Sequence, residues 1–418
     1  FVVDTGGYDQ KGVSPKVQSS LDELAELIDT AGAEVVGRMV QNREKIANDL
    51  YLGRGKVDEL RDMIYELGAT GVCCDDELSP AQLMNLQDAL DIKVMDRTMV
   101  ILDIFAAHAG SYEGKLQVEL AQLKFRATRL VGMRDSLSRL GGGIGTRGPG
   151  EKKLEIDRRV IRDRISRLKA ELKAVEAQRW QQRKQRQQSA VPVIGIVGYT
   201  NAGKSTLLNA LTGAGVLEED KLFATLDPTT RSFKLPGGQN VLLTDTVGFI
   251  RKLPHHLVEA FGSTLEEAKY CDVILHVVDA SDDNWDSNIE TVYSTLQQLK
   301  IDEDSGKPVI TVFNKTDRLS RDDLAGVRDL RADRTLYVSA KTGQGLDELA
   351  RAIEEVLREQ KTYIRHTFAY TDAGMAGLIH KYGEIKTEEY LDDGIFIEAY
   401  VPKFILGKLG MADEEEKY

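Results

Sequence analysis

Up to Ala109, segments whose apolar residues have helical spacing alternate with short apolar runs typical of strands. Between Ser20 and Gly32, Leu and Ile recur every three or four residues, which predicts an amphipathic helix that Gly32 ends. The same pattern recurs in three more segments: 55–68, 79–90 and 97–109. Ser79, followed by Pro80, is the expected N-cap of the second of these. Short apolar runs between the helices (33–41, 69–76 and 91–96) predict strands, and this order predicts a small parallel sheet.

Two long helical patterns replace the strands from Tyr112 on. In the first, apolar residues recur at Leu116, Leu120, Leu123 and Leu130. The second runs through 151–188, with a stripe at Leu154, Val160 or Ile161, Ile165, Leu168, Leu172 and Val175. Between them, the stretch SRLGGGIGTRGPGE is expected to break any helix, because it holds six glycines among the ten residues 141–150. We predict a coiled-coil-like helical hairpin with this glycine-rich loop at its tip.

A continuous apolar run at 191–198 is typical of a strand covered on both faces and begins a new domain. Four more strands are predicted at 240–246, 272–280, 308–315 and 334–340, and helices at 204–211, 257–268, 288–299 and 345–358. This alternation predicts an open, doubly wound α/β domain. The remaining residues predict strand, helix, strand, strand and short helix: 362–370, 372–382, 383–390, 394–400 and beyond.

We therefore predict an α/β protein of four parts. They are an N-terminal parallel α/β domain (1–111), a basic helical hairpin (112–189), a doubly wound domain (190–360) and a small α+β domain (361–418). No apolar run approaches the ~20 residues of a membrane span. The first residues lack a Met and a leader pattern, so we interpret the start as trimmed. Three cysteines without metal spacing fit small buried residues in a reduced, cytoplasmic setting.

The net charge of −12 argues against a nucleic-acid partner, but its distribution does not. Residues 124–188 hold 19 Lys and Arg against 7 Asp and Glu, so the rest of the chain is more acidic than the total suggests. The basic second helix is either a polyanion-binding surface or a solvated charged face. The glycine-rich loop with Arg147 favours the first interpretation, because so flexible a segment cannot bury a core but a polyanion could order it.

GYTNAGKS, residues 198–205, has the spacing G-x-x-x-x-G-K-S between a predicted strand and a predicted helix. In that context successive N–H groups wrap phosphate oxygens, and the helix N-terminus adds positive potential. We expect Lys204 to reach the β- and γ-phosphates and the Ser205 hydroxyl to bind Mg²⁺. The predicted phosphate-binding residues are Gly198, Tyr199, Thr200, Asn201, Ala202, Gly203, Lys204, Ser205 and Thr206.

Three further motifs, DTVG, NKTD and SAK (339–341), each follow at the end of a predicted strand. In DTVG, Asp245 should hold Mg²⁺ and the Gly248 N–H should approach the γ-phosphate, with Thr246 and Val247 between them. In NKTD, the Asp317 carboxylate can accept two hydrogen bonds from guanine that adenine cannot donate. The other predicted base contacts are Asn314, Lys315, Thr316, Ser339, Ala340 and Lys341. Together these motifs indicate a GTP/GDP site.

The loop KLFATLDPTTRSF offers Thr225, Thr229 and Thr230 to complete the Mg²⁺ shell, and we choose Thr225. Its neighbours Phe223, Ala224, Leu226 and Asp227 are predicted to lie at the nucleotide. Phe249 follows DTVG where many relatives place a water-orienting Gln, and it cannot bond a water. Catalysis then depends on positioning and charge stabilisation by Lys204, Thr225 and Gly248, so we expect slow turnover stimulated by a partner.

The chain resembles the HflX-type GTPases of the Obg–HflX group in the TRAFAC class. The resemblance lies in YLGRGKVDEL, SPAQ, DRTMVILDIFAAHA, EGKLQVELAQL, GGGIGTRGPGE, GYTNAGKSTLLN, LFATLDPTTR and DTVGFI, spread over residues 51–250. It implies a P-loop GTPase domain, a cytoplasmic and monomeric protein, and an apolar residue at position 249 as a family trait. It also implies a factor that binds the large (50S) ribosomal subunit and splits or rescues 70S ribosomes under stress, with ATP as a side substrate in some members.

The resemblance further implies that the glycine-rich loop probes 23S rRNA. On this basis the expected rRNA contacts are Arg139, Gly142, Gly143, Arg147, Lys152 and Lys153. The lysines at 152 and 153 replace a more usual Thr-Gln and should strengthen such contacts. Two other functions remain open: a GTPase of ribosome assembly or RNA modification, and a signalling switch that docks a protein on the hairpin. The six histidines are scattered without ligand spacing, so no second catalytic site is predicted.

Overall fold

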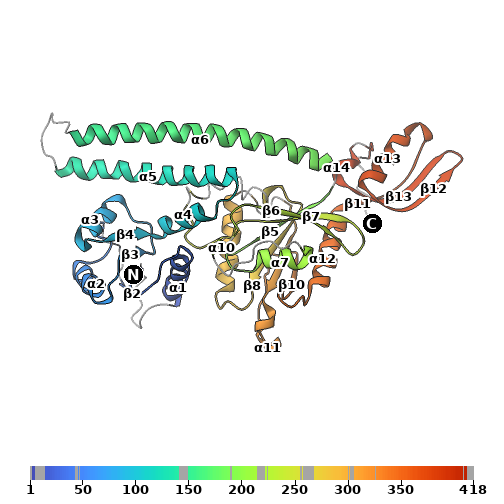
Figure 1. Ribbon diagram of the computed structural model, residues 1–418. Helices are drawn as coiled ribbons and strands as arrows, with labels where there is room; N and C mark the ends of the chain where they lie inside the picture. Colours follow the sequence, from blue (N-terminus) through green and yellow to red (C-terminus); the bar gives the residue numbers. More distant parts are fainter. Residues whose placement is uncertain are drawn as a thin grey trace. The chain divides into compact units, whose positions relative to one another are not determined.

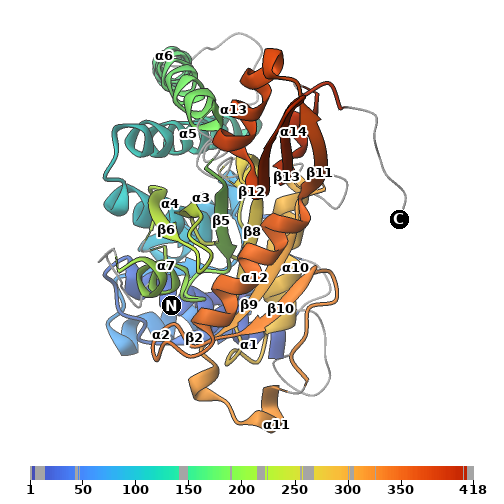
Figure 2. The same cartoon turned by 90° about the vertical axis from the view of Figure 1, so that its right-hand side faces the viewer.

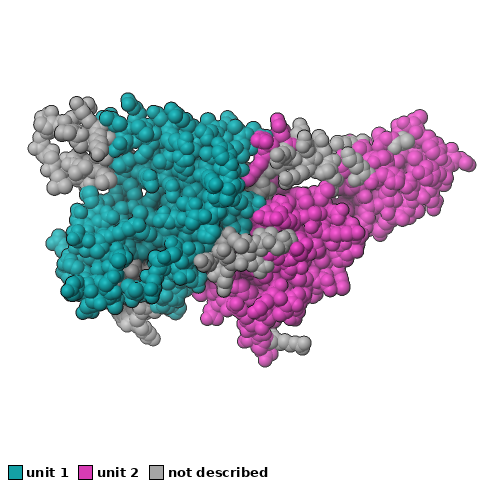
Figure 3. Space-filling view, in the orientation of Figure 1, with its two compact units in different colours: residues 1–177, 217–228, 247–265 teal, residues 178–216, 229–246, 266–418 magenta. Residues whose placement is uncertain are grey.

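The computed structural model describes most of the chain, and the statements below concern those residues: 2–4, 15–42, 46, 48–140, 149–188, 191–213, 222–223, 225–254, 257, 268–299, 301, 306–324, 326–407 and 409–411. The glycine-rich tip and most of the helix predicted at 257–268 lie outside them. The chain forms two compact units (Figure 3). Unit 1 comprises 1–177, 217–228 and 247–265, and unit 2 comprises 178–216, 229–246 and 266–418.

Unit 1 contains a four-stranded parallel sheet in the order β2-β1-β3-β4 (Figure 1). Its strands are β1 (Val2–Asp4), β2 (Arg38–Val40), β3 (Gly71–Cys74) and β4 (Lys93–Asp96). Its helices are α1 (Pro15–Thr30), α2 (Arg54–Leu67), α3 (Pro80–Leu90) and α4 (Arg97–His108). The predicted small parallel α/β fold is confirmed. The sequence analysis missed β1, because three residues are too short a run for periodicity to register.

The caps of these helices are where the sequence places them. The Ser79 Oγ accepts a hydrogen bond from the Gln82 N–H at 3.2 Å, and the Gln82 side chain accepts one from the Ser79 N–H at 2.9 Å. This reciprocal pair satisfies N–H groups that the first turn of α3 leaves without a helical partner. Asp96 does the same for α4 by accepting from the Met99 N–H at 3.0 Å.

The predicted hairpin consists of α5 (Tyr112–Leu140) and α6 (Pro149–Gln188), which run side by side (Figures 1 and 2). Their shared core is the predicted leucine stripe: Leu116, Leu120, Leu168 and Leu172, with Leu123 and Ile165 against it. Val160 is 59% exposed, so Ile161 is the apolar position that faces inward. The segment SRLGGGIGTRGPGE, predicted to interrupt the helices, is longer than the interruption in the structure. Both flanks of the glycine-rich loop, through Leu140 and from Pro149, continue the helices.

Unit 2 contains a six-stranded sheet in the order β10-β9-β8-β5-β7-β6. Its strands are β5 (Val193–Gly198), β6 (Thr229–Lys234), β7 (Asn240–Asp245), β8 (Val273–Asp279), β9 (Val309–Asn314) and β10 (Arg334–Tyr337). All neighbours are parallel except β6 and β7. The sequence analysis missed β6, because TTRSFK is a polar edge strand without an apolar run.

Helices cover both faces of this sheet. The α7 (Lys204–Thr212) and α12 (Leu346–Glu359) helices share one core cluster with Val273, Leu275 and Val277 of β8. The α10 helix (Trp285–Gln298) shares another with Val278, one residue further along the same strand. Because successive strand residues point to opposite faces, these clusters lie on opposite sides of the sheet. The predicted doubly wound domain is confirmed, with one antiparallel edge strand.

The C-terminal part of unit 2 is a three-stranded antiparallel sheet in the order β11-β13-β12 (Figure 2). It comprises β11 (Lys361–Phe368), the short helical turn η3 (Tyr370–Asp372), α13 (Ala373–Tyr382), β12 (Glu384–Leu391), β13 (Gly394–Pro402) and α14 (Lys403–Leu406). The short helices η2 (Thr316–Arg318) and α11 (Arg321–Leu324) lie between β9 and β10. The predicted α+β fold is confirmed. Cys73, Cys74 and Cys271 are buried free thiols. Within the described residues, no helix combines the length and apolarity needed to span a bilayer.

A buried ion pair holds α1, β3 and α4 together in unit 1. Arg97 is 1% exposed and donates to the Asp75 Oδ1 at 2.7 Å and to Glu23. Asp75 is fully buried. Burial alone raises the pKa of Asp75, but Arg97 first and then Lys252 outweigh it, so that pKa is lowered. The carboxylate therefore depends on its cationic neighbours to stay charged inside the fold.

We expect Arg97→Met to lower the free energy of unfolding of this region by about 3–5 kcal/mol, because it leaves Asp75 and Glu23 short of a partner. Hydrogen exchange of the amides of α1 and β3 in the full chain measures this. The matched control is Arg38→Met, which removes a solvent-exposed pair with Asp22 and should cost less than about 1 kcal/mol. Equal effects of the two substitutions would contradict the assignment.

Candidate nucleotide-binding site

The P-loop connects β5 to α7 in unit 2, at the carboxyl edge of the sheet. A Cβ on Gly198 would lie 2.2 Å from the Val277 carbonyl oxygen, so only glycine fits there. Gly203 has φ +90° at the N-cap of α7. The Lys204 ammonium donates to the carbonyl oxygens of Gly198 (3.2 Å) and Tyr199 (2.8 Å). The loop therefore has the turn geometry that leaves main-chain N–H groups available for phosphate oxygens.

Lys204 is a buried cation in this loop. Burial lowers the pKa of its ammonium to about 8, against the opposing effect of Asp245, and Lys315 adds a small further decrease. A phosphate placed against it would add negative charge and favour the protonated form. The side chain is thus positioned to bind an anion.

Asp245 ends β7 as a fully buried carboxylate. Its Oδ2 accepts a hydrogen bond from the Ser205 Oγ at 2.7 Å. The next side chain, Thr246, donates to the Ile196 carbonyl oxygen at 2.7 Å and fixes this end of the strand against β5. Two hard oxygen donors beside a phosphate-binding loop are what Mg²⁺ prefers, so the residues fit the ion.

The base-binding motif is attached directly to the P-loop. The Asn314 Nδ2 donates to the Ala202 carbonyl oxygen at 3.0 Å, and its Oδ1 accepts from the Ala340 N–H at 3.0 Å. Lys315 donates to the Asn201 carbonyl oxygen at 2.8 Å and pairs with Asp279 at 2.8 Å. The predicted phosphate and base segments therefore form one connected structure.

Asp317 lies exposed above this structure. Its Oδ1 accepts from the Ser339 hydroxyl at 2.6 Å, and chiefly this bond lowers the pKa of the carboxyl group. The lowered pKa favours the ionised carboxylate, which can accept hydrogen bonds from the two N–H donors of guanine. Thr316 donates to the Val338 carbonyl oxygen and fixes the following turn.

Some predicted site residues belong to unit 1, whereas the P-loop belongs to unit 2. These are Val247, Gly248 and the segment with Phe223, Thr225, Leu226 and Asp227. We call residues 222–228 the switch I segment and residues 247–254 the switch II segment. Asp227, predicted at the nucleotide, contacts Gly110 and Ser111 in this structure. Thr230, the alternative to Thr225, bonds Thr244 within the sheet at 3.0 Å.

Other predicted residues cannot be placed. Gly142, Gly143, Arg147 and Ala224 lie outside the described residues, as do the side chains of Arg139, Lys152 and Lys153. Sequence reasoning missed Asp279, which ends β8 and holds Lys315; its signal was the strand-terminal Asp in VILHVVDA. It also missed Lys252, whose ammonium contacts the carboxylates of Asp75 (2.5 Å) and Asp76 (2.7 Å). No local pattern marks that pairing.

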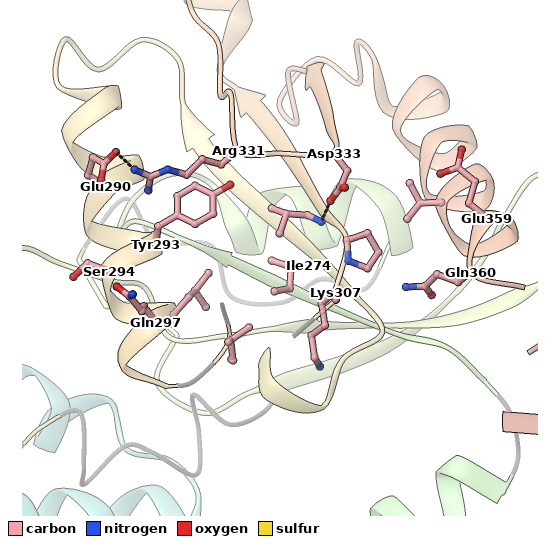
Figure 4. A pocket seen from close by; sticks show the side chains of 16 residues that line it. Ile274, Glu290, Tyr293, Ser294, Gln297, Lys307, Arg331, Asp333, Glu359 and Gln360 are labelled. Carbon is pink, nitrogen blue, oxygen red and sulfur yellow. Dashed lines mark hydrogen bonds and ion pairs between the residues drawn. The ribbon is translucent and has the colours of Figure 1, made fainter. Parts of the chain in front are cut away.

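A cavity of about 860 Å³ lies at the opposite, amino-terminal edge of the unit 2 sheet (Figure 4). Residues near the starts of β8, β9 and β10 line it, together with Glu290 and Tyr293 of α10. Glu290 and Arg331 form an ion pair across its wall at 2.7 Å. Because ligands of open α/β sheets bind at the carboxyl ends of the strands, this cavity is distinct from the nucleotide site.

The phosphate loop, the strand-end carboxylate and the base loop of unit 2 define a P-loop guanine-nucleotide-binding protein. Family models match three consecutive regions of the chain. They are described as GTP-binding GTPase N-terminal (residues 18–106), GTP-binding GTPase Middle Region (108–186) and 50S ribosome-binding GTPase (193–315). Together they span well over half of the sequence.

Named relatives agree with these matches. The chain is 61% identical to the GTPase HflX of Lacrimispora saccharolytica, over 95% of this chain and 93% of that protein. It is 44% identical to the GTPase HflX of Escherichia coli, over 82% and 80%. The chain therefore belongs to the HflX family of GTPases, as the resemblance implied, and is a GTP-hydrolysing enzyme.

Among solved structures, a GTP-binding protein of Sulfolobus solfataricus in complex with GDP is 24% identical. The match covers 85% of this chain and 98% of that one, with a TM-score of 0.43.

We expect Gly198→Ala to weaken GDP binding by at least about tenfold, because the new Cβ collides with the backbone of β8 and displaces the phosphate loop. Titration of the purified full chain with a fluorescent GDP measures this. Gly213→Ala is the control: its φ is also positive, at +64°, but nothing lies within 4 Å of the added carbon. Equal binding by the two variants would show that the loop geometry is not the constraint.

Proposed function

We propose that this chain is a GTP-regulated factor that binds the 50S subunit and splits or rescues 70S ribosomes under stress. The observation that carries the proposal is a cationic helix in an acidic chain that also holds a guanine-nucleotide site. Among the α6 side chains that the structure describes (155–181), five basic ones are exposed: Arg159, Arg162, Arg167, Lys169 and Lys173. The family model described as a 50S ribosome-binding GTPase supports the choice of partner.

In this proposal the phosphates of GTP lie on the P-loop with Lys204 against the β- and γ-phosphates. Ser205, Asp245 and Thr225 would hold Mg²⁺, which neutralises the charge that develops on the transferred phosphoryl group. The Gly248 N–H contacts the γ-phosphate. Asn314, Lys315 and Asp317 hold guanine, and Asp317 disfavours adenine, so ATP is at most a side substrate.

The attacking water has no partner in Phe249. That side chain is apolar and 1% exposed, so it cannot orient a water. Hydrolysis by the isolated chain is therefore slow, and the ribosome supplies the missing alignment. We further propose that Arg139, Gly142, Gly143, Arg147, Lys152 and Lys153 contact 23S rRNA, and that the protein acts as a cytoplasmic monomer.

Asp317→Asn should weaken GTP binding by at least about a hundredfold, because the amide presents an N–H to a guanine N–H. The same variant should gain affinity for xanthosine triphosphate, whose extra carbonyl accepts that N–H. Competition titration with GTP and with xanthosine triphosphate measures both changes in affinity. Asp323→Asn, which alters another exposed Asp bonded to a serine, is the control and should change neither affinity. Loss of both nucleotides in Asp317→Asn would indicate unfolding of the loop instead.

GTP turnover with and without purified 50S subunits tests the link between the two halves of the function. We expect 50S subunits to accelerate the wild type by at least about tenfold, and to leave a variant lacking residues 141–150 near its basal rate. Basal GDP binding by the deletion variant shows that its nucleotide site is intact. Equal stimulation of both proteins would contradict a role for the glycine-rich loop.

Binding to the 50S subunit should weaken steeply with salt, because cations on α6 displace counterions from rRNA phosphates. Replacing Arg162 and Arg167 with Gln should lower the slope of log K against log salt by about two, one for each phosphate that is no longer neutralised. Cosedimentation at a series of salt concentrations measures the slope. Arg331→Gln, which removes an exposed cation of unit 2, should leave it unchanged. A slope that is flat in the wild type would refute the electrostatic account.

A further inference from the structure

Asp227 of the switch I segment contacts Gly110 and Ser111, the two residues that directly precede α5. Its Oδ2 accepts hydrogen bonds from the N–H groups of Gly110 (3.0 Å) and Ser111 (2.7 Å), and its Oδ1 accepts from the Ser111 hydroxyl. The same hydroxyl accepts from the Gly114 N–H at 2.9 Å. The first N–H groups of a helix have no partner within it, and a carboxylate there is favoured by the helix dipole. Asp227 thus helps to cap α5 from 116 residues further along the chain.

The Asp227 carboxylate lies so close to Gly110 and Gly114 that it leaves little room for a side chain at either position. A Cβ on Gly114 would lie 2.6 Å from the Asp227 Oδ1, and a Cβ on Gly110 would lie 3.3 Å from its Oδ2. Any side chain at position 114 would therefore force the Asp227 carboxylate to move from its present position. The contact depends on a glycine inside a helix, where glycine is otherwise unfavourable.

Apolar contacts hold the other end of the switch I segment in the same unit. Phe223 is 3% exposed, with φ +59°, and its ring meets the Phe105 ring of α4 edge to face at 4.7 Å. Leu222 and Leu226 are also buried. Thr225 lies between these anchors and is itself half-buried.

The switch I segment has two roles that constrain each other: Asp227 contacts the start of α5, and Thr225 is proposed to bind Mg²⁺. Thr225 and Asp227 are two residues apart, so their Cα atoms cannot be separated by more than about 7 Å. Under the proposed function, Thr225 binds Mg²⁺ and the γ-phosphate when GTP is present. A displacement of Thr225 on GTP binding is therefore passed along the chain to Asp227.

We propose that Asp227 is a positioning residue that transmits the nucleotide state to the hairpin. Its carboxylate caps α5 when no γ-phosphate holds Thr225, and it leaves α5 when Thr225 engages GTP. The inference rests on the proposed role of Thr225 and adds the element that responds: the helix that leads into the glycine-rich loop. GTP binding thereby changes the first turn of the hairpin itself.

Hydrogen exchange of the full chain, with GDP and with a non-hydrolysable GTP analogue, tests this. In the wild type, the amides of 111–115 should exchange at least about threefold faster with the analogue, because Asp227 no longer caps the helix. In Gly114→Ala they should exchange alike in both states. That variant should also bind the analogue about three- to tenfold more tightly, since no cap must be broken, with GDP affinity within about twofold of wild type.

Two further variants separate the contact from helix propensity. Ser111→Ala removes the hydroxyl that donates to Asp227. It should also reduce the difference in exchange between the two nucleotides, although position 111 lies outside α5 and the change does not alter helix propensity. Gly377→Ala places the same Gly-to-Ala change in α13, where nothing lies within 4 Å, and should keep the wild-type difference.

Identical exchange of 111–115 in the wild type with GDP and with the analogue would overturn the proposal, as would a Gly114→Ala protein that keeps the difference. Cosedimentation of the same samples with 50S subunits tests the proposed function separately. Nucleotide-independent 50S binding together with a nucleotide-dependent first turn of α5 would refute the proposed GTP regulation of ribosome binding and leave the cap mechanism standing.

Discussion

The nucleotide site depends on one buried side chain, Asn314. Its amide donates to the P-loop at Ala202 and accepts from the loop that follows β10 at Ala340. A Cβ on Gly203 would lie 2.3 Å from the Asn314 Nδ2, so the P-loop is in close contact with it. The segments predicted to bind the phosphates and the base therefore share one hydrogen-bonded frame.

The two switch segments belong to unit 1 in this structure. Asp227 caps α5, and Lys252 reaches the buried Asp75, whose negative charge Arg97 also stabilises. Burying an ion is costly unless partners surround it, so the contact of Lys252 with Asp75 favours one arrangement of the switch II segment. The hydrogen bonds of Asp227 hold the switch I segment. The segments proposed to detect GTP are thus held by specific polar partners on the domain that carries the hairpin.

The charge distribution also distinguishes the hairpin from the rest of the chain. Basic residues concentrate on the hairpin, while the chain as a whole carries −12. An acidic body is repelled by RNA phosphates wherever the hairpin does not cover it. Such a body favours a single orientation on a large polyanion. The apolar, buried Phe249 cannot orient a water, which is why the proposed function assigns that alignment to a partner.

Sequence alone determined the features that depend on local pattern. Periodicity predicted the leucine stripe of the hairpin, Ser79 and Pro80 predicted the start of α3, and motif spacing predicted the P-loop and the strand-end Asp245. It missed β1 and β6, since very short or polar strands are specified by their neighbours in the sheet.

Only the tertiary structure decided that Asp227 caps α5, that Asp279 holds Lys315 and that Lys252 pairs with Asp75. These partners lie far apart in the chain. A carboxylate or an ammonium group looks the same in sequence whether it faces water, a nucleotide or a distant helix. Its role is set by what folding brings within hydrogen-bond distance.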